Sequence, residues 1–325
     1  MSISELVANF SYDTFTEYLS EMKSNGTEIT TIGSSIMSRD IPLIRLGHGR
    51  RNILYVASHH GAEWITTPCL LKFAEEYTNE YNADKVTDIA VNCKTGDDSK
   101  TEIGITGKTD EKAECGRMTD DFTVWCVPLL NPDGVELELF GIEKSGILAE
   151  RQLKMNGGST DFSKWQANAR GVDLNHNYDC CFYEYKYIEK ERGITNGPTK
   201  FSGEYPESEP EVYALCSFIR SAGIESIITL HTQGEEIYYT SGGMYAPSSV
   251  EIARKLAYAT GYELSQATDT AAYGGLTDFA IRSLGIPSFT LECGRGENPL
   301  PREMFDSIYD RVRPALFGMP EFMKK

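Results

Sequence analysis

Short apolar runs recur along the chain and alternate with longer, mixed segments. Four of these runs are rich in β-branched and aromatic residues and span 53–57, 122–130, 226–230 and 288–291. They are continuously apolar rather than alternating, which is typical of strands that are covered on both faces. We therefore predict four buried strands of a parallel sheet.

The segments between these runs carry helix start and stop signals. A helix is predicted from Thr66 to about Tyr81, because Pro68 is tolerated in a first turn. The sequence Ser-Glu-Pro-Glu at 208–211 has capping-box spacing and predicts a helix that ends near Gly223. Further helices are predicted over 248–261, 277–285 and 301 to about 317. This alternation predicts an α/β fold with a mixed, mostly parallel central sheet flanked by helices.

We expect a single domain over residues 1–325, because no internal repeat or low-complexity tract divides the chain. Residues 92–121 are polar, but apolar runs flank them on both sides. This stretch is therefore predicted to be a surface excursion rather than a linker between domains.

Charge and cysteine content indicate which kinds of binding partner and which cellular compartment to expect. The chain has 31 basic and 48 acidic residues and a net charge of −17, which argues against nucleic acid or an anionic membrane as the main partner. No apolar run approaches the roughly 20 residues that span a bilayer. The first residues lack the basic composition of a signal peptide, and the 8 cysteines form no C-x-x-C pair. We expect reduced thiols and a cytoplasmic protein; the oligomeric state is left open.

Two of the five histidines follow predicted strands closely. His60 comes just after the run 53–57, and His231 directly follows the run 226–230. Glu63 lies three residues after His60, so both side chains can converge from one turn. Two imidazoles and one carboxylate at the carboxyl edge of a sheet form the ligand set of a catalytic Zn²⁺ site. The H-x-x-E spacing alone also arises by chance, and a loop histidine often only caps or packs.

A third strand end adds a carboxylate, because Glu292 directly follows the run 288–291. A glutamate in an exposed loop is usually only solvated. One at the end of a central strand is held rigidly at the active edge, which suits a general base for metal-bound water.

These residues, in this order along the chain, resemble the zinc carboxypeptidase family, the carboxypeptidase A-like metallopeptidases. The matching segments are His60-x-x-Glu63-Trp64, Asn131-Pro132-Asp133-Gly134, Gly171-Val172-Asp173-Leu174-Asn175-x-Asn177, Pro206-x-Ser208-Glu209-Pro210-Glu211, Leu230-His231 and Thr290-Leu291-Glu292. Two further stretches, 165–176 and 294–301, are similar to the γ-D-glutamyl-L-diamino-acid endopeptidase I branch.

The resemblance implies one Zn²⁺ per chain, bound by His60, Glu63 and His231, with Glu292 as the catalytic base. It also implies that Asp173 orients a ligand histidine, although an Asp that satisfies a loop backbone is the alternative. His59 matches no ligand position.

Departures from the family pattern bear on the substrate. The family clamps a terminal carboxylate with an Asn-Arg pair, and the aligned pair here is Asn175-His176, which lacks the bidentate guanidinium fork. Thr277 aligns with the pocket floor beside Asp278, which predicts a small polar pocket.

Two further family positions are replaced. Gln166 aligns with the arginine that polarises the scissile carbonyl, so either Gln166 or nearby Arg170 is expected to stabilise the oxyanion. The mobile tyrosine of the family aligns with Thr270, and Tyr273 is the candidate to take its place, although a chain with 18 tyrosines offers many by chance.

The leading hypothesis is a zinc metallopeptidase that cleaves γ-D-glutamyl-diaminopimelate in muropeptides, with endopeptidase or carboxypeptidase action left open. The alternatives are an ordinary zinc carboxypeptidase, an amidohydrolase of N-acyl amino acids, and an inactive homologue that only binds peptide.

Overall fold

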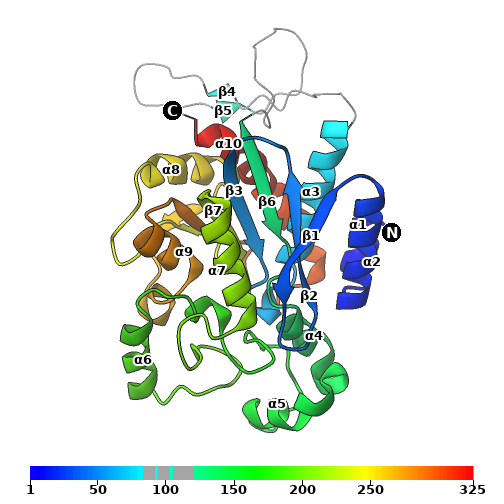
Figure 1. Ribbon diagram of the computed structural model, residues 1–325, viewed down its shortest axis with the longest axis vertical. Helices are drawn as coiled ribbons and strands as arrows, with labels where there is room; N and C mark the ends of the chain where they lie inside the picture. Colours follow the sequence, from blue (N-terminus) through cyan, green and yellow to red (C-terminus); the bar gives the residue numbers. More distant parts are fainter. Residues whose placement is uncertain (83–91, 94–102, 105–120, 325) are drawn as a thin grey trace.

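An eight-stranded mixed sheet forms the centre of the described part of the chain (Figure 1). The structure is a computed structural model that describes residues 1–82, 92–93, 103–104 and 121–324. In sheet order the strands are β1 (Glu28–Ser34), β2 (Asp40–Leu46), β6 (Phe122–Val127), β3 (Arg51–Ala57), β7 (Ile224–His231), β10 (Ser288–Glu292), β8 (Glu236–Tyr238) and β9 (Glu263–Ser265).

The two short strands β4 (Asn92–Cys93) and β5 (Ile103–Gly104) pair with each other outside this sheet. The remainder of the polar excursion predicted over 92–121 lies outside the described residues, apart from residue 121.

The four predicted strands form the centre of the sheet. Strands β6, β3, β7 and β10 pair in parallel, and their side chains are almost all buried. Strands β2 and β8 pair antiparallel on either side of this centre. The outer strands β1, β2, β8 and β9 were not predicted. For β1 and β9 the reason is clear, because their partly exposed residues show no continuous apolar run.

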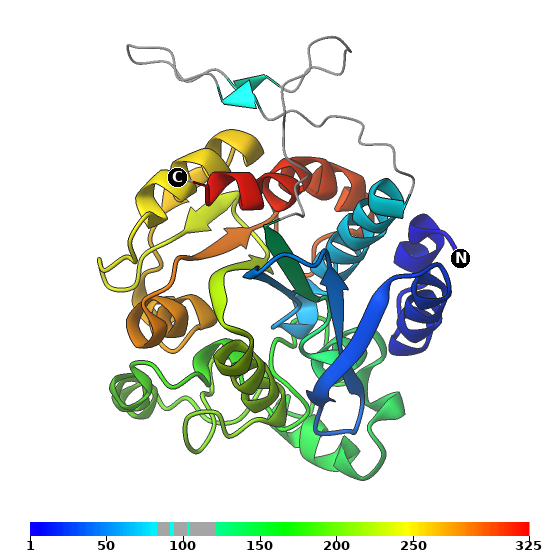
Figure 2. The same cartoon turned by 45° about the horizontal axis from the view of Figure 1, so that its top comes forward.

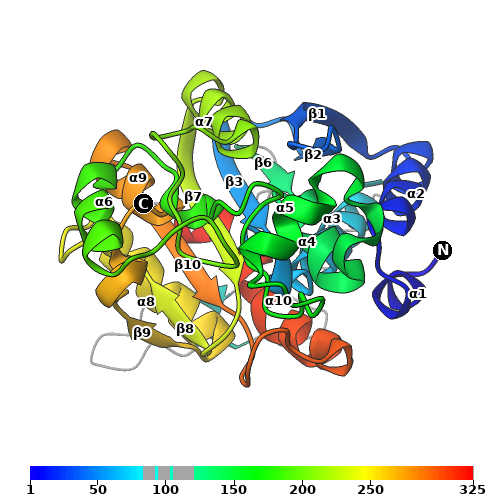
Figure 3. The same ribbon diagram turned by 90° about the horizontal axis from the view of Figure 1, so that it is seen from below.

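Helices cover both faces of the sheet. Their bounds are α1 (Ile3–Ala8), α2 (Tyr12–Ser24), α3 (Thr66–Asn82), α4 (Pro132–Phe140), α5 (Ala149–Met155), α6 (Phe182–Glu191), α7 (Pro210–Ala222), α8 (Ser249–Thr260), α9 (Leu276–Phe279) and α10 (Phe305–Phe322). Helices α3, α8 and α10 lie side by side along one face (Figure 2). Helices α7 and α9 contribute to the core on the other face (Figure 3).

Alternation along the strands separates these two cores. Ile53 and Tyr55 of β3 pack in the core with α3 and α10, whereas Leu54 and Val56 pack in the core with α7. This is the period of two that a strand imposes on its side chains. Among the described residues, no helix combines the length and the apolar character needed to cross a bilayer.

The predicted capping box at 208–211 is wrong. Helix α7 starts at Pro210 without a side-chain cap, because the Ser208 hydroxyl oxygen accepts instead from Asn177 Nδ2 at 2.9 Å. The buried Glu211 carboxylate accepts from the backbone N–H of Ile36 at 3.3 Å, far away in sequence. The predicted end is confirmed, since Gly223 takes a left-handed conformation with φ of 61°.

The last helix differs from its prediction at both ends. Helix α10 begins at Phe305 and continues through Pro314 to Phe322. Proline removes one helical hydrogen bond, but the residues after Pro314 are buried almost without interruption, so packing offsets the loss. The predicted helix 277–285 is the short α9 followed by a π-helical turn, Ala280–Leu284, and it ends at Gly285 as expected.

Candidate active site

The carboxyl ends of three neighbouring strands meet at one edge of the sheet. His231 is the last residue of β7 and pairs in register with Glu292, the last residue of β10. His60 follows β3, the parallel neighbour of β7 on its other side. A cavity of about 210 Å³ opens at this edge, and these three side chains line it together with Glu63.

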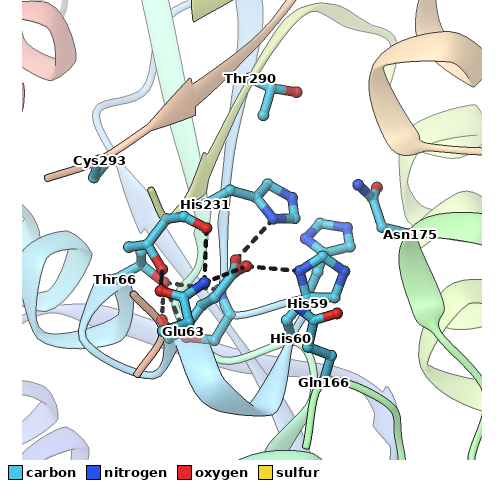
Figure 4. Close-up of polar contacts among 12 residues, drawn as sticks. His59, His60, Glu63, Thr66, Gln166, Asn175, His231, Thr290 and Cys293 are labelled. Atoms are coloured by element: carbon cyan, nitrogen blue, oxygen red, sulfur yellow. Dashed lines mark hydrogen bonds and ion pairs between the residues drawn. The ribbon is translucent and has the colours of Figure 1, made fainter. Parts of the chain in front are cut away.

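Both predicted ligand histidines face the predicted ligand carboxylate (Figure 4). His60 Nδ1 lies 2.9 Å from Glu63 Oε1, and His231 Nδ1 lies 2.9 Å from Glu63 Oε2. One ligand atom from each residue lies within 4.8 Å of the other two, which is close enough for a single ion. Glu63 and His231 are each 2% exposed.

The protonation chemistry of this group fits a metal ion. His60 Nε2 lies 3.1 Å from Asp173 Oδ1, and a carboxylate oxygen only accepts, so the proton of a neutral His60 ring belongs on Nε2. Its Nδ1 lone pair then points at the Glu63 carboxylate. A lone pair that faces a carboxylate needs either a cation between the two groups or a second proton on the ring, and two imidazoles with one carboxylate are a ligand set of catalytic Zn²⁺ sites.

The charges of the site shift the pKa values of its members in opposite directions. Burial would raise the pKa of Glu63, but His60 and His231 lower it to about 2. Burial would lower the pKa of His60, but Glu63 and Asp173 raise it well above its ordinary value. Burial, reinforced by the charge of Glu63, raises the pKa of Glu292 well above that of a free glutamate.

A tight turn, Gly61–Glu63, brings Glu63 back toward His60. A Cβ at Gly61 would collide with the backbone oxygen of Gly134, so only glycine fits there. Asn131 braces the same loop, since its Nδ2 donates to the His59 carbonyl at 2.9 Å and its Oδ1 accepts from Gly134 at 2.9 Å. The Asn-Pro-Asp-Gly motif at 131–134 therefore supports the loop rather than lining the cavity.

Asp173 lies where the resemblance expected it. Besides contacting His60, its Oδ2 accepts from the backbone N–H of Lys200 at 2.9 Å, and its Oδ1 accepts from that of Asn175 at 3.2 Å. The fixed carboxylate thereby holds the His60 ring in one orientation. His59 is not part of the ligand group, because its Nε2 bonds the Tyr178 hydroxyl at 2.8 Å.

Asn298 is a site residue to which the sequence assigned no role. Its Nδ2 donates to the Thr232 carbonyl at 2.9 Å and to Glu63 Oε1 at 3.3 Å, and its Oδ1 accepts from the Thr232 hydroxyl at 2.7 Å. It therefore orients Glu63 as Asp173 orients His60. The only sequence signal was its place in the stretch 294–301.

The two candidates for oxyanion stabilisation lie in different surroundings. Gln166 lines the cavity, and its amide oxygen accepts from the Thr199 hydroxyl, which leaves its amide N–H₂ as the free donor. The Arg170 guanidinium is bound at 3.0 Å to both the Glu209 carboxylate and the Ser208 carbonyl, and it does not line the cavity.

The predicted substrate-binding residues are only partly brought together. Asn175, His176 and Thr277 line the cavity, whereas Tyr273 does not. Tyr273 instead contributes its carbonyl oxygen, 2.8 Å from His176 Nδ1. Thr277 is buried and bonds Thr290 at 2.9 Å, so both hydroxyl side chains lie together in the cavity wall.

Comparisons with known proteins agree with this geometry. A family model described as zinc carboxypeptidase matches residues 12–314. The chain is 32% identical over 284 residues to gamma-D-glutamyl-L-diamino acid endopeptidase 1 of Lysinibacillus sphaericus, a match that covers 87% of this chain. This chain spans 64% of the length of that relative.

Two further matches also extend over most of this chain. An uncharacterized protein of Bacillus subtilis is 31% identical over 289 residues, which is 88% of this chain and 70% of that protein. The fold of bovine thrombin-activatable fibrinolysis inhibitor, solved in complex with tick carboxypeptidase inhibitor, superposes with a TM-score of 0.67 at 19% identity and 96% coverage of both chains.

Proposed function

Because the chain belongs to the zinc carboxypeptidase family, we propose that it is a zinc-dependent peptidase that cleaves the amide bond between a γ-D-glutamyl residue and a diamino acid. The observation that carries the proposal is the convergence of His60, Glu63, His231 and Glu292 on one cavity. The similar endopeptidase of Lysinibacillus sphaericus supports the choice of bond. Six cysteines are free thiols, and a cytoplasmic location remains part of the proposal; they are Cys69, Cys126, Cys180, Cys181, Cys216 and Cys293.

The residues of the cavity divide the chemistry among them. His60, Glu63 and His231 would hold zinc, which supplies Lewis acidity toward the scissile carbonyl and lowers the pKa of its water when bound. Glu292 takes the proton of the attacking water and passes it to the leaving amine. Gln166 donates its amide hydrogen to the oxygen that gains negative charge, and its fixed carbonyl end keeps the donor in place.

The residues that line the cavity bear on the choice of substrate. Among the described residues that line it, there is no arginine to form bidentate bonds with a terminal carboxylate. An ordinary carboxypeptidase depends on such a clamp, so that alternative is disfavoured. An inactive peptide-binding homologue is disfavoured because the ligand group and Glu292 are both in place. The N-acyl amino acid amidohydrolase remains the second candidate within the enzyme class.

The test is incubation of the zinc-loaded protein with L-Ala-γ-D-Glu-meso-diaminopimelate and mass spectrometry of the products. Release of free diaminopimelate is the expected result, and the Glu292→Gln variant is the matched control for a contaminating peptidase. Blocked dipeptides that end in Phe, Leu or Arg should be cleaved with a much lower kcat/KM. A preference for these dipeptides would contradict the proposal and indicate an ordinary carboxypeptidase.

A further inference from the structure

One wall of the cavity presents hydrogen-bond acceptors where the family pattern has a guanidinium. We call His176 and Asp278 the acceptor wall. Both line the cavity, and each is only 6% exposed. A ligand that enters the cavity can therefore add hydrogen bonds to acceptors that are already largely shielded from water.

His176 is held in a single orientation and protonation pattern. Its ring stacks on Tyr185 with centroids 4.2 Å apart and planes at 2°. Its Nδ1 lies 2.8 Å from the Tyr273 carbonyl oxygen, which only accepts, so Nδ1 carries the hydrogen. Nε2 of the neutral ring then carries the lone pair, and His176 lines the cavity. Burial lowers the pKa of His176, which keeps the ring neutral near pH 7.

Asp278 is a buried carboxylate that only uncharged groups bind. Its Oδ2 accepts from the backbone N–H of Gly275 at 3.1 Å, and its Oδ1 accepts from the Ser241 hydroxyl. The neighbouring cation, Arg282, donates to Ser241 instead, at 2.6 Å from Nε to Oγ. Each carboxylate oxygen can accept more than one bond, and Asp278 forms no direct ion pair among the described residues, although the charge of Arg282 acts on it from beyond Ser241.

Asn175 adds a donor beside this wall. Its Oδ1 accepts from the backbone N–H of Leu276 at 3.1 Å, so its amide N–H₂ is left for the cavity. Lys200 is the one ammonium side chain among the described residues that line the cavity, which also holds the carboxylates of Glu63, Asp173, Asp278 and Glu292. A bound Zn²⁺ would balance the carboxylates at the metal end, so the attraction for a positively charged ligand rests on Asp278.

We propose that His176 and Asp278 bind the terminal ammonium of the diamino acid on the leaving-amine side of the scissile bond. This assignment rests on the proposed function and adds a specificity rule to it. The side-chain ammonium is the recognised group, and the side-chain carboxylate of diaminopimelate contributes little. Lysine in that position should therefore be accepted as diaminopimelate is.

Four free amino acids separate the contribution of the side-chain ammonium from that of the side-chain carboxylate. They share the α-amino acid group and differ only at the side-chain end. meso-Diaminopimelate carries an ammonium and a carboxylate there, L-lysine only the ammonium, L-2-aminopimelate only the carboxylate, and L-norleucine neither. Binding of each to the full, zinc-loaded chain is measured by titration calorimetry or ligand-observed NMR. Lysine and diaminopimelate should bind roughly tenfold or more tightly than the other two, as for hydrogen bonds to a charged group.

Two variants test whether the preference for lysine depends on His176 and Asp278. Asp278→Asn and His176→Phe should each remove most of the preference for lysine while leaving norleucine binding unchanged; the phenyl ring retains the stack on Tyr185. Unchanged norleucine binding also shows that the cavity is intact, which matters because Asp278 bonds the first turn of α9. The control is Asp269→Asn, which removes an exposed carboxylate that is paired with Arg192 and does not line the cavity.

The inference is overturned if lysine binds no better than norleucine, if aminopimelate binds better than lysine, or if Asp278→Asn keeps the full preference. These measurements need no turnover. Loss of tripeptide cleavage with an intact lysine preference would therefore refute the proposed function alone, and cleavage without that preference would refute the inference alone.

Discussion

The two ends of the cavity are built in different ways. At the metal end, His231 and Glu292 are the last residues of paired strands, and His60 follows the neighbouring strand. The acceptor wall comes from irregular segments, with His176 in a short turn after Asp173 and Asp278 in the four-residue helix α9. In the proposed function, the sheet positions the residues of the reaction, while loops and short turns position those that bind the substrate.

The two ends also satisfy their polar groups differently. At the metal end, Asp173 contacts the outer nitrogen of His60 and Asn298 donates to Glu63, whereas Nε2 of His231 is buried without a hydrogen-bond partner among the described residues. At the acceptor wall, the Tyr273 carbonyl takes Nδ1 of His176, while the backbone N–H of Gly275 and the Ser241 hydroxyl each donate to one oxygen of Asp278. A change at the metal end should therefore abolish the reaction, and a change at the wall should redirect it.

The largest effect is expected from His231→Ala. Removal of one of three ligands should release most of the zinc and abolish turnover. Metal analysis of the purified variant measures the first effect, and His48→Ala is the control, because that imidazole is half exposed and outside the cavity. Stoichiometric zinc in His231→Ala would refute the ligand assignment.

The next largest effect is expected from Glu292→Gln. The amide cannot accept the proton of the attacking water, so kcat/KM should fall by roughly 10²–10⁴-fold. Zinc content should stay at the wild-type level, because Glu292 is not part of the ligand group. Loss of zinc, or near-normal turnover, would show that the residue has another role.

The paired variants Gln166→Met and Arg170→Met test which side chain stabilises the oxyanion. Loss of the Gln166 donor should lower kcat by roughly 10²–10³-fold. Arg170→Met breaks the contact with Glu209 and should lower the thermal midpoint with little change in kcat. The reverse pattern would assign the oxyanion role to Arg170.

A smaller effect is expected from Asp173→Asn, because Asp173 contacts the ligand His60 and is not itself part of the ligand group. Loss of the charged partner of His60 should weaken zinc binding by roughly 10–100-fold, because such partners orient a ligand and raise its basicity. Competition with a chelator of known affinity measures the change. An unchanged zinc affinity would mean that Asp173 serves only its contacts to the backbone N–H groups of Asn175 and Lys200.

The sequence alone was enough to predict the four central strands and the group His60, Glu63, His231 and Glu292 at their ends. Both signals are local: a continuous apolar run marks a strand covered on two faces, and a polar residue that follows it must lie at the sheet edge. The outer strands β1 and β9 carry no such run. Their residues are partly exposed, so no continuous apolar segment marks them as strands in the sequence.

Contacts between segments distant in sequence decided which polar side chains and atoms face the cavity. Arg170 is four residues from Gln166, yet Glu209 and Ser208 hold it outside the cavity. His176 is an acceptor only because the Tyr273 carbonyl takes its Nδ1 hydrogen, and Asp278 has no direct ion pair with Arg282 because that guanidinium bonds Ser241. Which atom of a side chain remains free depends on the partner that the fold supplies, and no local pattern of residues specifies that partner.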